Sequence, residues 1–198
     1  MEQALTKKQR THQRMLDAAG QSFRSNGYAG IGVDGIAKAA GVTSGAFYAH
    51  FGSKDGAFEA ALKAGLDEVI DAVPTFQRDH GGKWVEGFAD YYLGKAHRKD
   101  LACGCAMTSL SPEIARAAPD VRAIYETKMK NIVDLIADGL AGRSREDRIA
   151  RAWAVIGTLI GGLTVARAVK TQRLSEEIAS SIRTAAGIAA GEVRKDCS

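Results

Sequence analysis

Residues 36–54 have the sequence IAKAAGVTSGAFYAHFGSK, in which two short helix-forming segments meet at Ala40-Gly41-Val42. Gly41 can adopt the left-handed backbone conformation that a tight turn between helices requires, because it carries no Cβ. Apolar residues flank this turn, and small alanines beside them allow the two segments to pack closely. The stretch therefore predicts a helix-turn-helix, in which the second helix enters the major groove of DNA.

The helix expected after this turn is suited to a DNA groove. Its opening side chains are small and leave room for base edges, while the N-terminus of a helix attracts phosphate. Tyr48 and His50 can hydrogen-bond phosphate oxygens, and Lys54 adds a charged contact. Each of them alone could be an ordinary surface group, but their joint occurrence after Gly41 favours DNA binding. The predicted DNA-binding residues are Thr43, Ser44, Gly45, Ala46, Tyr48, His50 and Lys54.

The excess positive charge lies at the N-terminal end of the chain. The 198 residues carry a formal net charge of +4. Residues 1–54 hold seven basic and three acidic residues, whereas residues 55–198 hold 20 of each sign. Such asymmetry indicates that the N-terminal part has a negatively charged partner.

Composition and periodicity indicate an all-α protein. Only three prolines occur, and no stretch alternates apolar and polar residues over the length of a strand. Pro74 is expected to end the fourth helix, because a proline removes a helical hydrogen bond. About nine helices are expected, over residues 6–26, 33–40, 43–51, 53–73, 84–97, 105–117, 119–139, 147–169 and 175–194.

The sequence argues against a secreted or membrane-spanning protein. Three cysteines, two of them two positions apart, cannot build a disulfide framework, and the first 30 residues contain no apolar signal segment. The longest uncharged run, residues 152–166, is shorter than the about 20 residues that span a bilayer. We therefore expect a cytoplasmic protein that does not associate with membranes.

Two other motifs give weak signals. Residues 30–35 match G-x-G-x-x-G, but a dinucleotide site also needs a preceding strand and a βαβ unit. The Cys-Gly-Cys triplet at 103–105 lies near His97 and Asp100 but lacks a second ligand pair at zinc spacing. No catalytic motif is found. We expect no cofactor, no metal and no catalytic residues, so the protein is not expected to be an enzyme.

The segment from Arg10 to Phe58 resembles the DNA-binding domain of the TetR family of transcriptional regulators. The resemblance implies an all-helical homodimer, with a three-helix helix-turn-helix domain at residues 1–54 and a larger ligand-binding and dimerisation domain at residues 55–198. It also implies repression at an operator in double-stranded DNA, relieved by a small-molecule inducer. The matching positions are Phe23, Gly27, Tyr28, Ile36, Ala37, Ala40, Gly41, Val42, Gly45, Phe47, Tyr48, His50, Phe51, Lys54 and Asp55.

Two features depart from the family pattern. Gly32 stands where family members usually have a Thr or Ser that caps the second helix, a difference of roughly a few tenths of a kcal/mol. The helix after Gly41 contains no Arg, Asn or Gln, so bidentate contacts to bases are scarce. These departures support an alternative, a helical small-molecule-binding protein that has lost DNA binding.

The last two predicted helices are expected to form the dimer contact. Residues 147–169 combine large apolar side chains at spacings of three and four with several glycines, which permit close approach of helices. Together with residues 175–194 they suit a four-helix bundle made from two subunits, an intramolecular helix pair being the alternative. A dimer also follows from the proposed role, because two recognition helices must reach half-sites about one DNA turn apart.

An inducer pocket is expected among the aromatic and methionine side chains of the C-terminal part, which suit an apolar or aromatic ligand. The alternative, which the pattern favours for each of these side chains, is an ordinary place in the core. Cys105 lies near the start of a predicted helix, whose dipole would lower the thiol pKa. Cys103 or Cys105 is therefore a candidate sensor of oxidants or electrophiles, a buried and inert thiol being the alternative. The candidate pocket residues are Trp84, Phe88, Tyr91, Tyr92, Met107, Leu110, Tyr125 and Met129.

Overall fold

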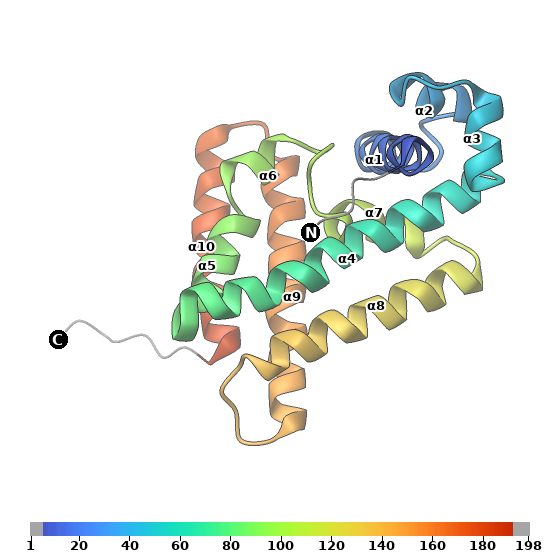
Figure 1. Cartoon of the computed structure of the whole chain (residues 1–198). Coiled ribbons are helices and arrows are strands. Elements are labelled where there is room, and N and C mark those ends of the chain that lie inside the picture. The colour runs from blue at the N-terminus through green and yellow to red at the C-terminus, as the bar shows by residue number, and fades with distance from the viewer. Residues whose placement is uncertain (1–5, 192–198) are drawn as a thin grey trace.

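The computed structural model describes residues 6–191 (Figure 1). Every regular element in this range is a helix, which confirms the all-α prediction, and the expected count of about nine is close. The elements are α1 (Lys7–Asn26), α2 (Val33–Ala39), α3 (Ser44–Phe51), α4 (Lys54–His80), the 3-10 turn η1 (Gly81–Lys83), α5 (Trp84–Tyr92), α6 (Lys95–Lys99), α7 (Ala106–Ile114), α8 (Pro119–Asp138), α9 (Arg145–Ala168) and α10 (Gln172–Ala190).

Buried aromatic side chains hold the first helices together. Phe23 of α1 and Phe47 of α3 are completely buried, and both belong to the same core cluster as Ile36 of α2. Phe23 meets Phe58 of α4 edge-on, with ring centroids 5.1 Å apart. Such edge-to-face pairs add to the stability gained by burial. The start of α4 therefore packs as part of the N-terminal helices.

Helix α4 is the long element that connects these N-terminal helices with the rest of the chain (Figure 1). The prediction that it ends at Pro74 is wrong, because Pro74 lies inside the helix. Proline removes one helical hydrogen bond. Val73 is completely buried, and Phe76 packs against Phe88 with ring centroids 5.4 Å apart. Core packing of Val73, which is buried, and of Phe76, which is partly buried, therefore offsets the lost hydrogen bond.

The single helix predicted over residues 84–97 is two helices, α5 and α6. Gly94 separates them, and a Cβ at this position would lie 3.0 Å from the carbonyl oxygen of Tyr91. The side chain of Leu93 is completely buried, and its carbonyl accepts a hydrogen bond from Arg98 Nε at 2.9 Å. The chain therefore turns at Gly94, and α6 starts in a new direction.

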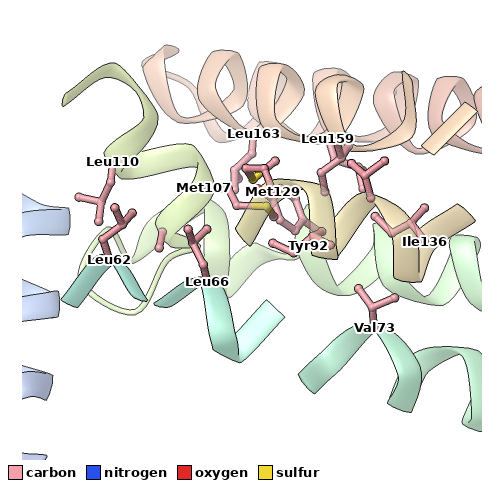
Figure 2. Packing of buried hydrophobic residues seen from close by; sticks show 14 of the residues in the cluster. Leu62, Leu66, Val73, Tyr92, Met107, Leu110, Met129, Ile136, Leu159 and Leu163 are labelled. Atoms are coloured by element: carbon pink, nitrogen blue, oxygen red, sulfur yellow. The ribbon is translucent and has the colours of Figure 1, made fainter. Parts of the chain in front are cut away.

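Helices α9 and α10 pack against each other through small residues. A Cβ on Gly162 of α9 would lie 2.4 Å from Cγ2 of Ile182 on α10, so glycine permits this close approach. By length and composition alone, α9 could cross a membrane. Its Leu159 and Leu163 are, however, completely buried among side chains from α4, α5, α7 and α8 (Figure 2). This burial is what a core helix of a globular fold shows.

Candidate functional site

The turn between α2 and α3 has the geometry expected of a helix-turn-helix. Gly41 has a φ of +65°, in the left-handed region that favours glycine. The Gly41 N–H donates to the Lys38 carbonyl at 3.1 Å, and the Val42 N–H donates to the Ala37 carbonyl at 3.0 Å. These two bonds form a Schellman motif, which satisfies carbonyls at the end of α2. The motif sets the direction in which α3 leaves the turn.

Two hydroxyl side chains lie at the N-terminus of α3, and only one of them can still donate a hydrogen bond to DNA. Thr43 caps the helix, because its Oγ1 accepts a hydrogen bond from the Ala46 N–H at 3.2 Å, and its side chain is exposed. Ser44 instead donates its hydroxyl to the carboxylate of Asp34 at 2.5 Å. Of these two predicted contacts, Thr43 keeps its hydroxyl proton available for another partner. The nearby Asp34 carboxylate reduces the positive potential at this helix end.

Neighbouring aromatic residues give α3 an inner and an outer face. Phe47 is completely buried, whereas Tyr48, the next residue, remains 51% exposed. Gly45 is exposed as well, and Ala46 is partly exposed. The outer face of α3 thus presents one phenol group among small side chains, which leaves its backbone accessible.

His50 points towards α1. Its Nδ1 lies 3.3 Å from Nδ1 of His12, and the ring of His12 lies 5.3 Å from that of Phe51, measured between centroids. His50 therefore helps to pack α3 against α1. The sequence offers no signal for this pairing, because the two histidines are 38 positions apart.

Lys54, at the start of α4, belongs to a small polar cluster. Its ammonium group lies over the ring of Tyr28, 4.3 Å from the centroid, which is a cation–π contact. The Tyr28 hydroxyl donates a hydrogen bond to the Asp55 carboxylate. This hydrogen bond, with burial and the negative charge of Asp55, raises the pKa of Tyr28 to about 12. The cluster holds the Lys54 ammonium group near the end of α1.

We expect the Asp55→Asn substitution to lower the pKa of Tyr28 towards its ordinary value of about 10. In the wild type the Tyr28 phenol is protonated and hydrogen-bonded to Asp55 at pH values below its pKa of about 12. The contribution of this bond to stability is therefore present below pH 10 and is lost as the pH rises through about 12. Ultraviolet titration of both proteins, each compared with its Tyr28→Phe variant, measures the shift. Identical Tyr28 titration curves in the two proteins would contradict it.

Three of the eight predicted pocket residues line a common cavity. Phe88, Tyr91 and Tyr92 surround a space of about 70 Å³ between α4, α5 and the segment before α7. Phe88 and Tyr92 also belong to the buried core, as do Trp84, Met107, Leu110 and Met129, which do not line the cavity. Figure 2 shows Met107, Leu110 and Met129 among leucines of α4 and α9. Tyr125 shares a hydrogen bond of 2.6 Å with Ser111. The other residues that line this cavity are Gly65, Glu68, Val69, Ala72, His97, Cys103, Gly104 and Cys105.

Both candidate sensor thiols line this cavity. Cys103 is exposed and Cys105, the N-cap residue of α7, is partly buried. The expectation that the helix dipole lowers the pKa of Cys105 is wrong, because burial raises it and outweighs the hydrogen bonds that favour the thiolate. A hydrogen bond to Asp100 likewise raises the pKa of Cys103. Both thiols are therefore mostly protonated at neutral pH.

Comparison with known proteins relates the N-terminal helices to a family. Residues 15–61 match the family model described as bacterial regulatory proteins, tetR family. The HTH-type transcriptional repressor NemR of Escherichia coli K12 is 23% identical over 133 residues, which are 66% of this chain and 67% of NemR. The HTH-type transcriptional repressor KstR2 of Rhodococcus jostii RHA1 is 31% identical over 119 residues, which are 60% of this chain and 50% of KstR2.

Solved structures share the fold along most of the chain. A TetR-family transcriptional regulator of Cytophaga hutchinsonii has a TM-score of 0.75 at 19% identity, covering 93% of this chain and 97% of that protein. The reduced form of E. coli NemR has a TM-score of 0.73 at 16% identity, covering 88% of this chain and 96% of NemR. The likeness therefore extends beyond the helix-turn-helix to the C-terminal helices.

Proposed function

Because the chain belongs to the TetR family of transcriptional regulators, we propose that it is a cytoplasmic repressor that a small molecule or a modified cysteine releases from its operator. The observation that carries this proposal is the geometry of α2 and α3. Gly41 turns the chain so that α3 buries Phe47 and exposes Tyr48. A helix held in this way can enter a major groove.

The proposed DNA contacts divide by type. Thr43, Gly45 and Ala46 lie at the start of α3, where small side chains can approach base edges. Tyr48 and Lys54 have polar groups that suit phosphate oxygens, which position a protein on DNA without reading the sequence. We assign Ser44 and His50 to the same surface, although each also has a partner within the protein.

The Lys54→Ala substitution should weaken binding to all DNA sequences and lower the salt slope of the binding constant by about one. The physical reason is the loss of one ammonium–phosphate contact and of the counterion that this contact releases. Fluorescence anisotropy at several salt concentrations measures the slope. Lys63→Ala is the matched control, since Lys63 lies on α4 and pairs with Glu59. A salt slope equal to that of the wild type would show that Lys54 does not contact a DNA phosphate.

Selection of bound duplexes from a random DNA pool tests the proposed function directly. We expect one recurring, two-fold symmetric sequence, because a symmetric dimer places two identical helices on DNA. The alternative is a ligand-binding protein that has lost DNA binding, and the Asp34 carboxylate beside the N-terminus of α3 favours it. Failure to enrich any sequence, from protein with native circular dichroism, would support that alternative.

Part of the surface of α9 and α10 is apolar, and we propose that it forms the homodimer. Trp153 and Val165 of α9 are 44% and 53% exposed, and Ile188 of α10 is 58% exposed. A Cβ on Gly157 or Gly161 of α9 would have nothing within 4 Å in a single subunit. Exposed apolar side chains beside open glycines suit close packing against a second copy.

The proposed inducer acts at the cavity that Phe88, Tyr91 and Tyr92 line. Its volume of about 70 Å³ is far below the roughly 300 Å³ of the smallest common ligand pockets. An apolar or aromatic inducer must therefore widen the cavity, and Gly65 and Val69 on its wall belong to α4. Because α4 begins beside α3, such a shift would move the DNA-binding helix. The inducer releases DNA only if it binds the shifted state more tightly.

The cysteine branch of the proposal rests on Cys103 and Cys105, which line this same cavity. E. coli NemR, whose structure is described as a reduced form, has the same fold. An adduct on either sulfur would take up space that the cavity does not have. We therefore expect a modified cysteine to act on α4 as the inducer does.

Treatment with a small alkylating reagent should modify Cys103 faster than Cys105, because Cys103 is exposed. Operator affinity should fall as modification proceeds, and replacement of both residues by serine should abolish the response. Mass spectrometry of the peptides and DNA binding of the same samples measure the two effects. If alkylated wild-type protein binds its operator as tightly as untreated protein, release by cysteine modification is refuted. Release by a small-molecule inducer would not be affected by this result.

A further inference from the structure

A second pocket, of about 160 Å³, lies where α6, the end of α9 and the start of α10 meet. It is separate from the cavity that the cysteines line. Five basic side chains contribute to its wall, and no acidic residue does. They are Lys95, Arg98 and Lys99 of α6, Arg167 in the last turn of α9, and Lys170 in the segment between α9 and α10. So many like charges around one hollow repel one another unless an anion neutralises them.

Two of the five basic side chains are fixed in place. The Arg98 side chain is only 5% exposed, and it donates from Nε to the Leu93 carbonyl at 2.9 Å. Arg167 donates from Nε and Nη2 to the His97 carbonyl at 2.9 and 2.7 Å. Hydrogen bonds to neutral carbonyls orient a guanidinium group but do not cancel its charge. Arg98 also forms an ion pair with Glu176, which lies outside the pocket and pairs with Arg183 as well. The charge of Arg98 is therefore partly neutralised.

Arg167 is a partly buried cation. Burial lowers the pKa of its guanidinium, and this effect outweighs the opposing influence of Tyr92, Cys105 and Asp100. The group nevertheless stays protonated, because the ordinary pKa of arginine is so high.

The other three basic residues form a rim with available donors. Lys95, Lys99 and Lys170 are exposed, and within residues 6–191 their ammonium groups make no ion pair or hydrogen bond. Thr171, which caps the start of α10, also lines the pocket. Flexible ammonium groups can close over an anion that enters the pocket.

We propose that this pocket binds the phosphate group of a small molecule. A tetrahedral dianion matches the chemistry of the pocket, because lysine and arginine both donate charge-assisted hydrogen bonds to phosphate oxygens. The size favours a single group, since 160 Å³ holds one phosphate and little of the molecule that carries it. The pocket is a concave site at a junction of three helices, which favours a small ligand over the backbone of DNA.

Titration of the full chain with inorganic phosphate at low ionic strength tests the proposal. We expect saturable binding at one site per subunit by calorimetry, together with a rise in melting temperature. The double substitution Lys99→Gln/Lys170→Gln should weaken this binding at least about tenfold, since it removes two charge-assisted contacts. The matched control is Lys83→Gln/Lys130→Gln, which removes the same charge from exposed positions elsewhere. Circular dichroism verifies that both variants are folded.

Two results would overturn the proposal. The first is an absence of saturable phosphate binding to the wild type. The second is equal weakening in the two double variants, which would show that only net charge matters. Neither result depends on whether the chain represses transcription, because the measurement contains no DNA.

A DNA-binding measurement distinguishes the phosphate of a small molecule from the phosphates of the DNA backbone. In phosphate-free buffer, both double variants should bind duplex DNA with the same salt slope. A slope lower by about two for Lys99→Gln/Lys170→Gln alone would assign these lysines to the DNA backbone and overturn the small-molecule site.

Discussion

Replacement of Gly161 by leucine should convert the protein into folded single subunits that bind the operator at least about a hundredfold more weakly. Gly161 is exposed on α9, and a Cβ there has no neighbour within 4 Å in one subunit, so the subunit itself can accommodate the new side chain. In the proposed dimer the same leucine would hold the two α9 helices apart. A single subunit then loses the gain of about 10²–10⁴ in affinity that two linked binding heads provide.

The adjacent glycine is the matched control for this prediction. A Cβ on Gly162 would lie 2.4 Å from Cγ2 of Ile182, within the same subunit. Gly162→Leu should therefore destabilise the subunit, by about 1–3 kcal/mol or more for an overpacked core. Sedimentation velocity and thermal unfolding distinguish the two effects. A Gly161→Leu protein that remains dimeric would show that subunits associate through another face.

The Phe47→Ala substitution should destabilise the N-terminal helices by about 3–5 kcal/mol, the cost of truncating a buried phenylalanine. Phe47 is completely buried, and its ring lies 5.1 Å from that of Phe51, between centroids. Without it, α3 loses its main contact with the core. We expect DNA binding to be lost because the recognition helix is no longer held in place. Hydrogen exchange of α1, α2 and α3, together with chemical denaturation, measures the change.

Tyr48→Ala is the control for that experiment, since Tyr48 is the next residue on α3 but is half-exposed. We expect the Tyr48→Ala protein to be about as stable as the wild type. Its affinity should fall for every DNA sequence, as expected when a contact to phosphate is lost. Equal stability of the Phe47→Ala and Tyr48→Ala proteins would contradict the assignment of inner and outer faces to α3.

The helix-turn-helix was predictable because its signals are local. Gly41 has the backbone conformation that the turn was expected to require. Thr43 and Ser53 cap α3 and α4 through hydrogen bonds to nearby backbone groups, and Gly27 follows the last residue of α1. Each of these signals involves residues at most four positions apart, and the packing of the helices opposes none of them.

Several other expectations failed because contacts between distant residues outweighed local preference. Pro74 does not end α4, since Val73 and Phe76 are held by the core on both sides of it. The thiol of Cys105 lies at a helix N-terminus, yet burial raises its pKa. Local preference contributes little free energy per residue, and burial of one large side chain exceeds it.

The amino-acid sequence alone was enough to specify an all-helical protein, a turn at Gly41 and a basic N-terminal part. Helix caps, apolar periodicity and local charge depend on residues that are close together in the sequence. The packing of the helices decided which aromatic side chains line a cavity. It also decided how five basic residues of α6, α9 and the segment after α9 share one pocket. These arrangements join segments up to 75 positions apart, from Lys95 to Lys170, and only the packing of a closed core brings such segments together.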